Sequence, residues 1–252
     1  MATLYTIKGV TGAARRRTAY TELCERIIRG RIGPGTRLTE TDVARQLGVS
    51  RTPAREALQR LFAEGFLVRA NQGRRIELAV SPLTRADLIE VYRGTSALEG
   101  AAARGVAELS PKERKALAAR MNRLTAAFQS LGESRPDATE EMFDLHNAFH
   151  DQIDAHCAGP RIRALLGAIR PHVQRYEWVY APFVGSQRYR PTFVEHKRIV
   201  AAIARGNPEA AERAVRANWD NSATRLVQAL DRVGERGDWV LRGPADSKGS
   251  SP

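Results

Sequence analysis

Three histidines stand on the expected inward faces of helices, and their spacing is that of metal ligands. His146 and His150 belong to one apolar series: Phe143, His146, His150, Ile153 and Cys157. Because i and i+4 are one helical turn apart, both imidazoles face the same side. His196 falls in a second apolar series further along the chain. Imidazole nitrogen is a favoured donor for divalent transition metals, so the pattern predicts a metal site, with zinc first and nickel second.

Asn218 falls on the inward face of the last expected helix and is the weaker candidate ligand. Amides are poor ligands for soft metals, so Asn218 is expected to act through water or to contact an organic ligand. An unpartnered buried polar group costs about 1–3 kcal/mol, so these four residues need partners. A core in which they only hydrogen-bond to protein is the alternative interpretation.

A metal-dependent hydrolase using His146, His150 and His196 is the competing functional class. Zincin helices carry a glutamate base directly after the first histidine, and this chain has Asn147 there. Glycine-rich phosphate loops and nucleophile elbows are also missing from the sequence. We therefore expect a binding protein and no enzyme.

Composition places these residues in an ordinary globular chain. The 252 residues are 42% hydrophobic and 27% charged, which suits one large or two small domains. Residues 1–80 hold 15 Lys and Arg against 7 Asp and Glu, a net charge of +8, whereas residues 81–252 carry a net +4. Of the 40 basic residues 35 are arginine, whose planar guanidinium matches phosphate and guanine edges. The basic first third favours a domain that faces nucleic acid.

The same composition excludes several classes of protein. No stretch approaches the roughly 20 apolar residues of a membrane span, and the first 30 residues do not read as a secretory leader. Cys24 and Cys157 are far apart in sequence, so a structural disulfide is not expected. These observations predict a cytoplasmic protein with no membrane partner.

The first third has the element order of a winged helix-turn-helix, expected over residues 18–80 after a flexible basic arm, 1–17. A helix begins near Thr18 and stops at Gly30, and a short helix follows Thr39 and ends at Gly48. A longer helix is capped by Ser50 and stopped by Gly65. Two short strands, 66–68 and 76–80, joined at 71–73, predict a hairpin wing.

The longer helix divides into an apolar face and a basic end. Its expected inward residues are Ala57, Leu58, Leu61 and Phe62. Arg51 and Arg55 point the opposite way at the amino end, which is the part of a recognition helix that meets base edges. Thr52 stands beside them, with Arg45 on the preceding helix and Arg74 at the hairpin tip. A merely solvated basic face is the alternative interpretation.

The remainder predicts an all-helical domain over residues 84–233, built as a six-helix antiparallel bundle. Proline, glycine and serine punctuate the expected helices 84–107, 111–131, 138–157, 160–181, 187–205 and 208–233. The tail 234–252 is rich in glycine, serine and charge and is expected to be disordered. The fold class is therefore mainly α.

The first third contains an ordered run that reads Leu47-Gly48-Val49-Ser50-Arg51-Thr52-Pro53-Ala54-Arg55-Glu56-Ala57-Leu58. It is preceded by Leu38-Thr39-Glu40 and followed by Glu64-Gly65-Phe66-Leu67. These residues resemble the operator-binding domain of GntR-type bacterial transcription regulators. The resemblance implies that Arg51 and Arg55 read guanines and that the wing tip enters the minor groove. The wing of that family shows Gly-Arg-Gly, and this chain has Gly73-Arg74-Arg75, which keeps Gly73 and Arg74 as DNA contacts.

The second domain resembles the helical effector domain called FCD, found in the FadR branch of that family. The resemblance implies a metal set of one Asp or Asn and three His, which falls here on His146, His150, His196 and Asn218. This chain departs from that set at two of the four positions, with His146 in place of the acid and Asn218 in place of a histidine. Its ligands therefore bring less negative charge to the ion, so an anionic effector is expected to complete the coordination. Arg93 matches the family's inward arginine and, with Asn218 and Tyr176, is the expected effector contact.

Together these features predict a metabolite-responsive repressor that binds a palindromic operator as a homodimer. A small carboxylate effector is implied by the resemblance, with an aromatic-acid metabolite suggested by the Tyr176 region. A nonspecific architectural DNA protein is the further alternative, but it has no need of a polar-cored bundle of 150 residues.

Overall fold

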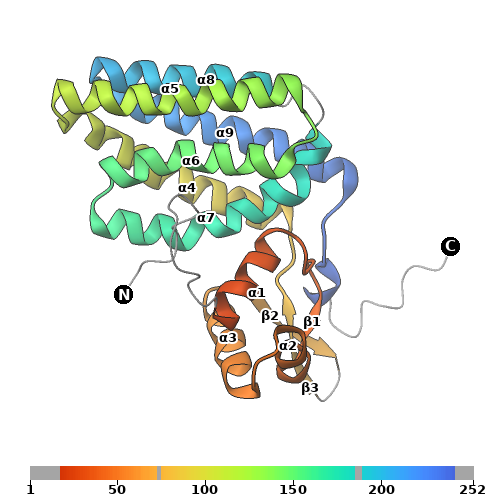
Figure 1. The fold of residues 1–252 in the computed structure, drawn as a ribbon. Helices are drawn as coiled ribbons and strands as arrows, with labels where there is room; N and C mark the ends of the chain where they lie inside the picture. Colours follow the sequence, from red (N-terminus) through yellow and green to blue (C-terminus); the bar gives the residue numbers. More distant parts are fainter. Residues whose placement is uncertain (1–17, 73–74, 185–188, 242–252) are drawn as a thin grey trace. The chain divides into compact units, whose positions relative to one another are not determined.

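The computed structural model of the chain describes residues 18–72, 75–184 and 189–241, and helices dominate it (Figure 1). This part of the chain forms two compact units. One is the helical unit, Leu88–Val233, and the other joins residues 18–87 to residues 234–241. The predicted mainly α fold class is confirmed.

The amino-terminal unit begins with the three predicted helices, α1 (Ala19–Ile28), α2 (Glu40–Leu47) and α3 (Arg51–Ala63). Thr18 and Thr39 cap the first two, because their side-chain oxygens accept hydrogen bonds from backbone N–H groups of the first turn. Gly48 ends α2 with φ 64°, the left-handed conformation that lets the chain turn sharply into α3. Ser50 occupies the N-cap position of α3 but makes no side-chain cap hydrogen bond.

A three-stranded antiparallel sheet completes the winged unit. Its strands β1 (Arg37–Leu38), β2 (Leu67–Gln72) and β3 (Arg75–Val80) lie in the order β1-β3-β2, with Leu67 opposite Val80. The hairpin is predicted from the sequence, but its first strand extends to Gln72 and not only to residue 68. Strand β1, which has only two residues, is not predicted. The arm 1–17 and the wing residues Gly73 and Arg74 lie outside the described residues.

Two sequence expectations for this unit are wrong. Phe62 was expected to face inward, but it is 37% exposed and the Arg69 guanidinium lies over its ring. The buried face of α3 starts at Ala54 and continues through Ala57, Leu58 and Leu61, and it does not include Phe62. The second error concerns the tail, expected to be disordered from residue 234.

Residues 234–241 are ordered and belong to the winged unit. Arg236 exchanges backbone hydrogen bonds with Leu83, and Asp238–Leu241 forms a short 3₁₀ helix, η4. Val240 is buried against Ala70 and Ala79 of the wing. The polar composition of the tail predicts disorder, but its first part is ordered because the Arg236 backbone pairs with Leu83 and Val240 is buried. Residues 242–252 lie outside the described chain.

The helical unit contains the predicted bundle helices. They are α4 (Arg85–Arg104), α5 (Pro111–Ser134), α6 (Thr139–Cys157), α7 (Pro160–Tyr180), α8 (Tyr189–Arg205) and α9 (Pro208–Val233), with 3₁₀ turns η1 (Gly105–Glu108) and η2 (Ala181–Val184). Prolines open several of them, and Ser110 forms a capping box with Glu113 at the start of α5. Figure 1 shows α5 beside α8, and these two helices contact each other. None of the described helices is long and apolar enough to cross a membrane.

The core of this unit holds large side chains together with polar ones. Tyr92, Phe149 and Trp219 are almost completely buried. Glu99, His150, His196 and Asn218 are buried among them, with at most 1% of each exposed. A domain interior does not tolerate such groups without partners, so this polar cluster marks the candidate site.

Candidate functional site

The three predicted histidines meet in the core of the helical unit. Helix α6 supplies His146 and His150 one turn apart, and α8 brings His196 against them. One ligand atom from each of the three lies within 4.8 Å of the others. His150 and His196 are fully buried, and the His146 side chain is 15% exposed. The juxtaposition predicted from the spacing is therefore present.

Aromatic rings pack the histidine cluster. Phe149 stacks on His196 with ring centroids 3.7 Å apart, and Trp219 lies 4.5 Å from His150. Burial lowers the pKa of both His150 and His196 well below the ordinary value. Neutral imidazole is the form that ligates metal.

The donor atoms fit a metal. Nε2 of His150 and both ring nitrogens of His196 are buried and have no hydrogen-bond partner among the described residues. Buried polar atoms are nearly always partnered, so these nitrogens lack what an all-hydrogen-bonded core would supply. Three convergent imidazoles are a donor set for zinc or nickel.

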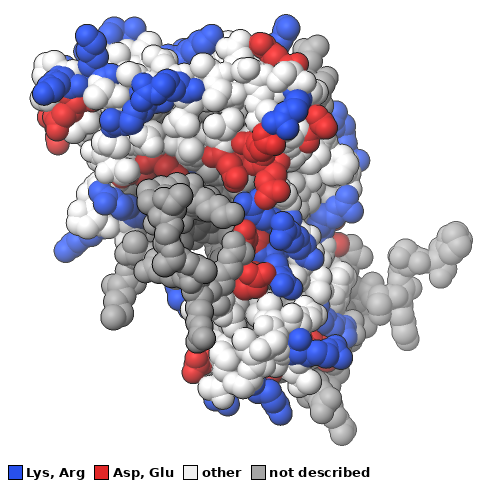
Figure 2. All heavy atoms as spheres, in the orientation of Figure 1, with Lys and Arg blue, Asp and Glu red and all other residues white. Residues whose placement is uncertain are grey.

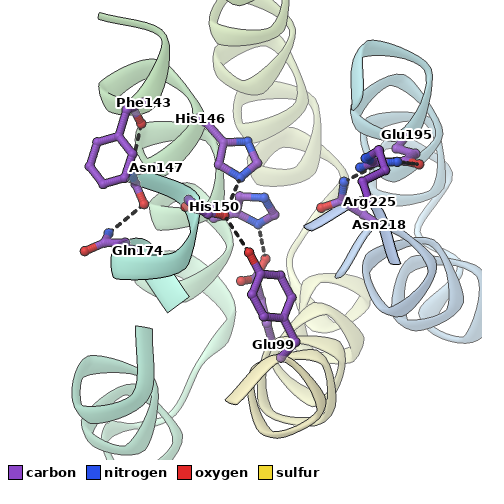
Figure 3. Close-up of polar contacts among 11 residues, drawn as sticks. Glu99, Phe143, His146, Asn147, His150, Gln174, Glu195, Asn218 and Arg225 are labelled. Carbon is purple, nitrogen blue, oxygen red and sulfur yellow. Dashed lines mark hydrogen bonds and ion pairs between the residues drawn. The ribbon is translucent and has the colours of Figure 1, made fainter. Parts of the chain in front are cut away.

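Glu99 of α4 joins the cluster and was missed by the sequence analysis. Its Oε1 lies 2.5 Å from Nδ1 of His150, and both side chains are fully buried (Figure 3). Burial raises the pKa of Glu99 to about 8. The signal was available in the sequence, because Tyr92, Thr95 and Glu99 share one buried face of α4.

Asn218 of α9 is buried as expected, but its amide nitrogen is already used. Nδ2 donates to Oε2 of Glu195 at 2.9 Å, and Arg225 binds the same carboxylate through two hydrogen bonds. Figure 3 shows Asn218, Glu195 and Arg225 grouped together. With its nitrogen directed at Glu195, Asn218 can offer only its carbonyl oxygen to a metal or ligand.

A cavity of about 100 Å³ adjoins the cluster, and His146 lines it. Its wall is mainly apolar and aromatic, with the side chains of Phe128, Met142, Phe143, Trp178, Val184 and Leu226. Polar side chains also line it, namely Thr139, Glu177, Thr192, Ser222 and Arg225. His146 therefore belongs both to the candidate metal centre and to the cavity wall.

Two expected effector contacts are placed elsewhere. Arg93 is exposed on α4, so the expectation that it faces the core is wrong. It lies between Tyr92 and Gly94 on a helix whose inward face is set by Tyr92, Thr95 and Glu99. Tyr176 is fully buried and stacks with Tyr180, and it is not among the residues found to line this cavity. The next two residues on α7, Glu177 and Trp178, reach the cavity instead.

Asn147 gives no support to hydrolase chemistry. Its Nδ2 donates to the backbone carbonyl of Phe143 at 2.8 Å, and its Oδ1 accepts from Gln174 at 2.6 Å. Figure 3 shows these contacts on the side of α6 away from His150. An amide engaged in this way cannot serve as the general base that a zincin places there.

The amino end of α3 presents the predicted basic surface. Arg51, Thr52 and Arg55 are exposed there, opposite the buried Ala54, Ala57 and Leu58. Arg45 of α2 is also exposed and pairs with Asp42 at 2.8 Å, while Arg51 lies 3.4 Å from Glu40. Figure 2 shows Lys and Arg side chains spread over the surface of each unit, so the position on α3, and not charge alone, distinguishes these arginines.

A winged helix-turn-helix with exposed arginines, joined to a helical unit with a buried histidine cluster, is the architecture of a transcriptional regulator. The chain belongs to the GntR family of bacterial regulatory proteins. Residues 15–77 match the model of that family, and residues 90–221 match the FCD domain. The resemblance found in the sequence is confirmed.

Several relatives are similar over most of the chain. The HTH-type transcriptional regulator YdhC of Bacillus subtilis is 26% identical over 84% of this chain and 91% of its own length. A probable D-xylose utilization operon transcriptional repressor of Paenarthrobacter nicotinovorans is 28% identical over 75% of this chain and 78% of its own. Among solved structures, E. coli McbR/YncC shares the fold, with 21% identity, a TM-score of 0.68 and coverage of 83% and 95% of the two chains.

Proposed function

We propose that the chain is a repressor that binds a palindromic operator as a homodimer and is released by a small organic acid bound at a metal in the helical core. The observation that carries the ligand-binding part is the double position of His146, in the histidine cluster and in the cavity wall. A ligand in the cavity would lie next to the metal. The protein is expected to act in the cytoplasm.

The DNA contacts are assigned to Arg45, Arg51, Thr52 and Arg55, with Gly73 and Arg74 at the wing. Arg51 and Arg55 are exposed at the end of α3 that meets base edges in helix-turn-helix proteins. Arginine binds guanine bidentately, and each such pair is worth about 1–3 kcal/mol of discrimination. Two half-sites one helical turn apart need two recognition helices, which is the reason for proposing a dimer.

The metal is assigned to His146, His150 and His196, with Asn218 as a weaker ligand through its carbonyl oxygen. Zinc suits three convergent imidazoles, and nickel is the second candidate. When bound, the ion supplies a positive charge that attracts a carboxylate into a mainly apolar cavity. Arg225 is less available for this, because Glu195 already pairs with it.

The effector is proposed to be a small aromatic or similarly apolar carboxylate. Aromatic and aliphatic side chains make up most of the cavity wall, so an apolar ring would be buried there favourably. An engineered apolar cavity of about 150 Å³ binds benzene, so the volume here of about 100 Å³ points to a ligand no larger than a single ring.

Operator binding tests the DNA side. Arg51→Ala together with Arg55→Ala should abolish sequence-selective gel shifts of the promoter against random competitor DNA. Arg93→Ala removes one charge from an exposed site on the helical unit, so it should leave operator binding intact and serves as the control. Undiminished selective binding by the double variant would refute the proposed recognition helix.

Thermal-shift measurements test the ligand side. Benzoate should raise the melting temperature of the Zn²⁺-loaded chain but not that of the chelator-treated chain, because a ligand that binds only the native state stabilises it. Succinate and gluconate, a dicarboxylate and a sugar acid, are the matched probes and should have less effect. Equal shifts with and without Zn²⁺ would contradict a metal-assisted site.

A further inference from the structure

One carboxylate in the cavity wall has an oxygen without a hydrogen-bond donor. Glu177 of α7 lines the cavity and is 8% exposed. Its Oε1 lies 3.4 Å from Nε2 of His146 and 3.5 Å from the hydroxyl of Tyr92. Both contacts reach the same oxygen, so Oε2 has no donor among the described residues. Because buried polar groups are nearly always hydrogen-bonded, this oxygen is available to a molecule in the cavity.

Glu177 lies beside the histidine cluster without belonging to it. The group of ligand atoms within 4.8 Å of one another contains His146, His150 and His196 but not Glu177. Of these histidines, His146 is the one paired with Glu177, and it also lines the cavity. Three histidine ligands leave a position at the ion for an acid. An acid that binds there through the cavity therefore comes within reach of Glu177.

The carboxylate of Glu177 restricts what that acid can be. Two ionised carboxylates repel each other in a poorly solvated wall, and neither can donate a hydrogen bond. A hydroxyl on the ligand resolves the conflict, because it donates to Glu177 and separates the two anions. An ammonium group would also donate, but it would lie beside the positive charge of the proposed ion.

The same distances place this hydroxyl on the ligand. Oε1 of Glu177 is 3.4 Å from the His146 nitrogen, so a donor that reaches Glu177 lies near the end of the ligand that carries the acid. A hydroxyl on the far side of a ring would point into the aromatic and aliphatic part of the wall, formed by side chains such as Phe128, Met142 and Leu226. The carbon next to the carboxylate is therefore the favoured position.

We infer that Glu177 selects effectors that carry a hydroxyl on the carbon next to the carboxylate, so the ligand class is a 2-hydroxy acid with a compact apolar remainder. This inference rests on the ligand site of the proposed function and narrows it. An acid without the hydroxyl brings its carboxylate against Glu177 and leaves Glu177 without a donor, which costs affinity.

Two acids that differ only by this hydroxyl test the inference. Calorimetry measures the dissociation constants of phenylacetate and of each enantiomer of mandelate for the Zn²⁺-loaded full chain. The better enantiomer of mandelate should bind more tightly than phenylacetate by about tenfold or more, the usual consequence of leaving a buried polar group unpaired.

Glu177→Gln keeps the size of the side chain and removes its charge. This variant should bind phenylacetate more tightly than the unsubstituted chain does, and its preference for mandelate should fall toward unity. A gain in affinity is not expected from a variant that is only less stable. Glu90→Gln makes the same change at an exposed site on α4 and should leave all the dissociation constants unchanged.

The outcomes separate this inference from the proposed function. If the Zn²⁺-loaded unsubstituted chain binds neither acid, the ligand site of the proposed function is wrong, and the role of Glu177 fails with it. If it binds both acids equally well, the site stands and only the inference is wrong. An undiminished preference for mandelate in Glu177→Gln would also overturn it. Should Glu177→Gln not fold, the same ratio is measured in Glu177→Met, which has neither the charge nor the acceptor.

Discussion

The Nδ1 atom of His150 lies 2.5 Å from Oε1 of Glu99, and neither side chain is accessible to solvent. Helices α4 and α6 are joined through this contact. It orients the imidazole so that Nε2, which has no hydrogen-bond partner among the described residues, is the nitrogen left for a ligand. Carboxylate–histidine pairs of this kind hold metal-binding imidazoles in place.

Glu99→Gln is therefore expected to lower Zn²⁺ affinity by about 10- to 100-fold, the usual effect of losing such a supporting carboxylate. Equilibrium dialysis at fixed free Zn²⁺, followed by metal analysis, measures it. Glu90→Gln changes an exposed glutamate of the same helix and should have no effect. Equal affinities for the two variants would show that Glu99 plays no part in orienting His150.

Metal binding should stabilise the native chain. At a free Zn²⁺ concentration 100 times the dissociation constant, linkage predicts a gain of about 2.7 kcal/mol in the free energy of unfolding. The increase in melting temperature between chelator and Zn²⁺ measures this gain. His196→Ala should lose the increase, whatever its own starting stability, because the cluster then has two histidines. The same increase in melting temperature in the unsubstituted chain and in His196→Ala would contradict a metal site at the histidine cluster.

Arg45 and Arg55 are expected to contribute to DNA binding in different ways. Arg55→Ala should cost about 1–3 kcal/mol on the operator and relax sequence preference at one base pair, because it removes a base contact. Arg45→Ala should weaken binding to all sequences alike and reduce the salt dependence by about one unit of slope, as the loss of a phosphate contact does. Salt titrations on operator and random DNA distinguish the two. If Arg45→Ala changed the sequence preference and Arg55→Ala weakened binding to all sequences alike, the two assignments would be contradicted.

Docking of residues 234–241 on the wing depends on a close approach of two glycines. A Cβ added to Gly237 would lie 2.6 Å from the backbone nitrogen of Gly35, and its φ is 73°. Gly237→Ala should therefore release the segment and speed hydrogen exchange of β2, the strand that η4 contacts. Gly234→Ala has the same left-handed strain, at φ 82°, but meets no atom within 4 Å, so it is the matched control. Identical exchange in both variants would mean that strain alone, and not the contact with Gly35, decides the effect.

Local signals predicted most of the fold. Proline and serine at helix starts and glycine after helix ends act through backbone geometry that neighbouring residues determine, so α2, α3 and the bundle helices were found close to their observed bounds. The histidine cluster followed from the period of the helix and the need to bury apolar residues. Errors arose where packing decides. Phe62 and Arg93 were assigned to the wrong faces, and β1 exists only because β3 pairs with it.

The amino-acid sequence by itself determined the kind of protein, because the arginines of α3 and the helical spacing of His146 and His150 are properties of short segments. Only the tertiary structure decided which acidic groups lie around the histidines. Glu99, Glu177 and Glu195 come from three different helices, and their distances from the histidines depend on how those helices pack. The placement of Val240 on the wing has the same cause, since residues far apart in sequence meet only when the chain is folded.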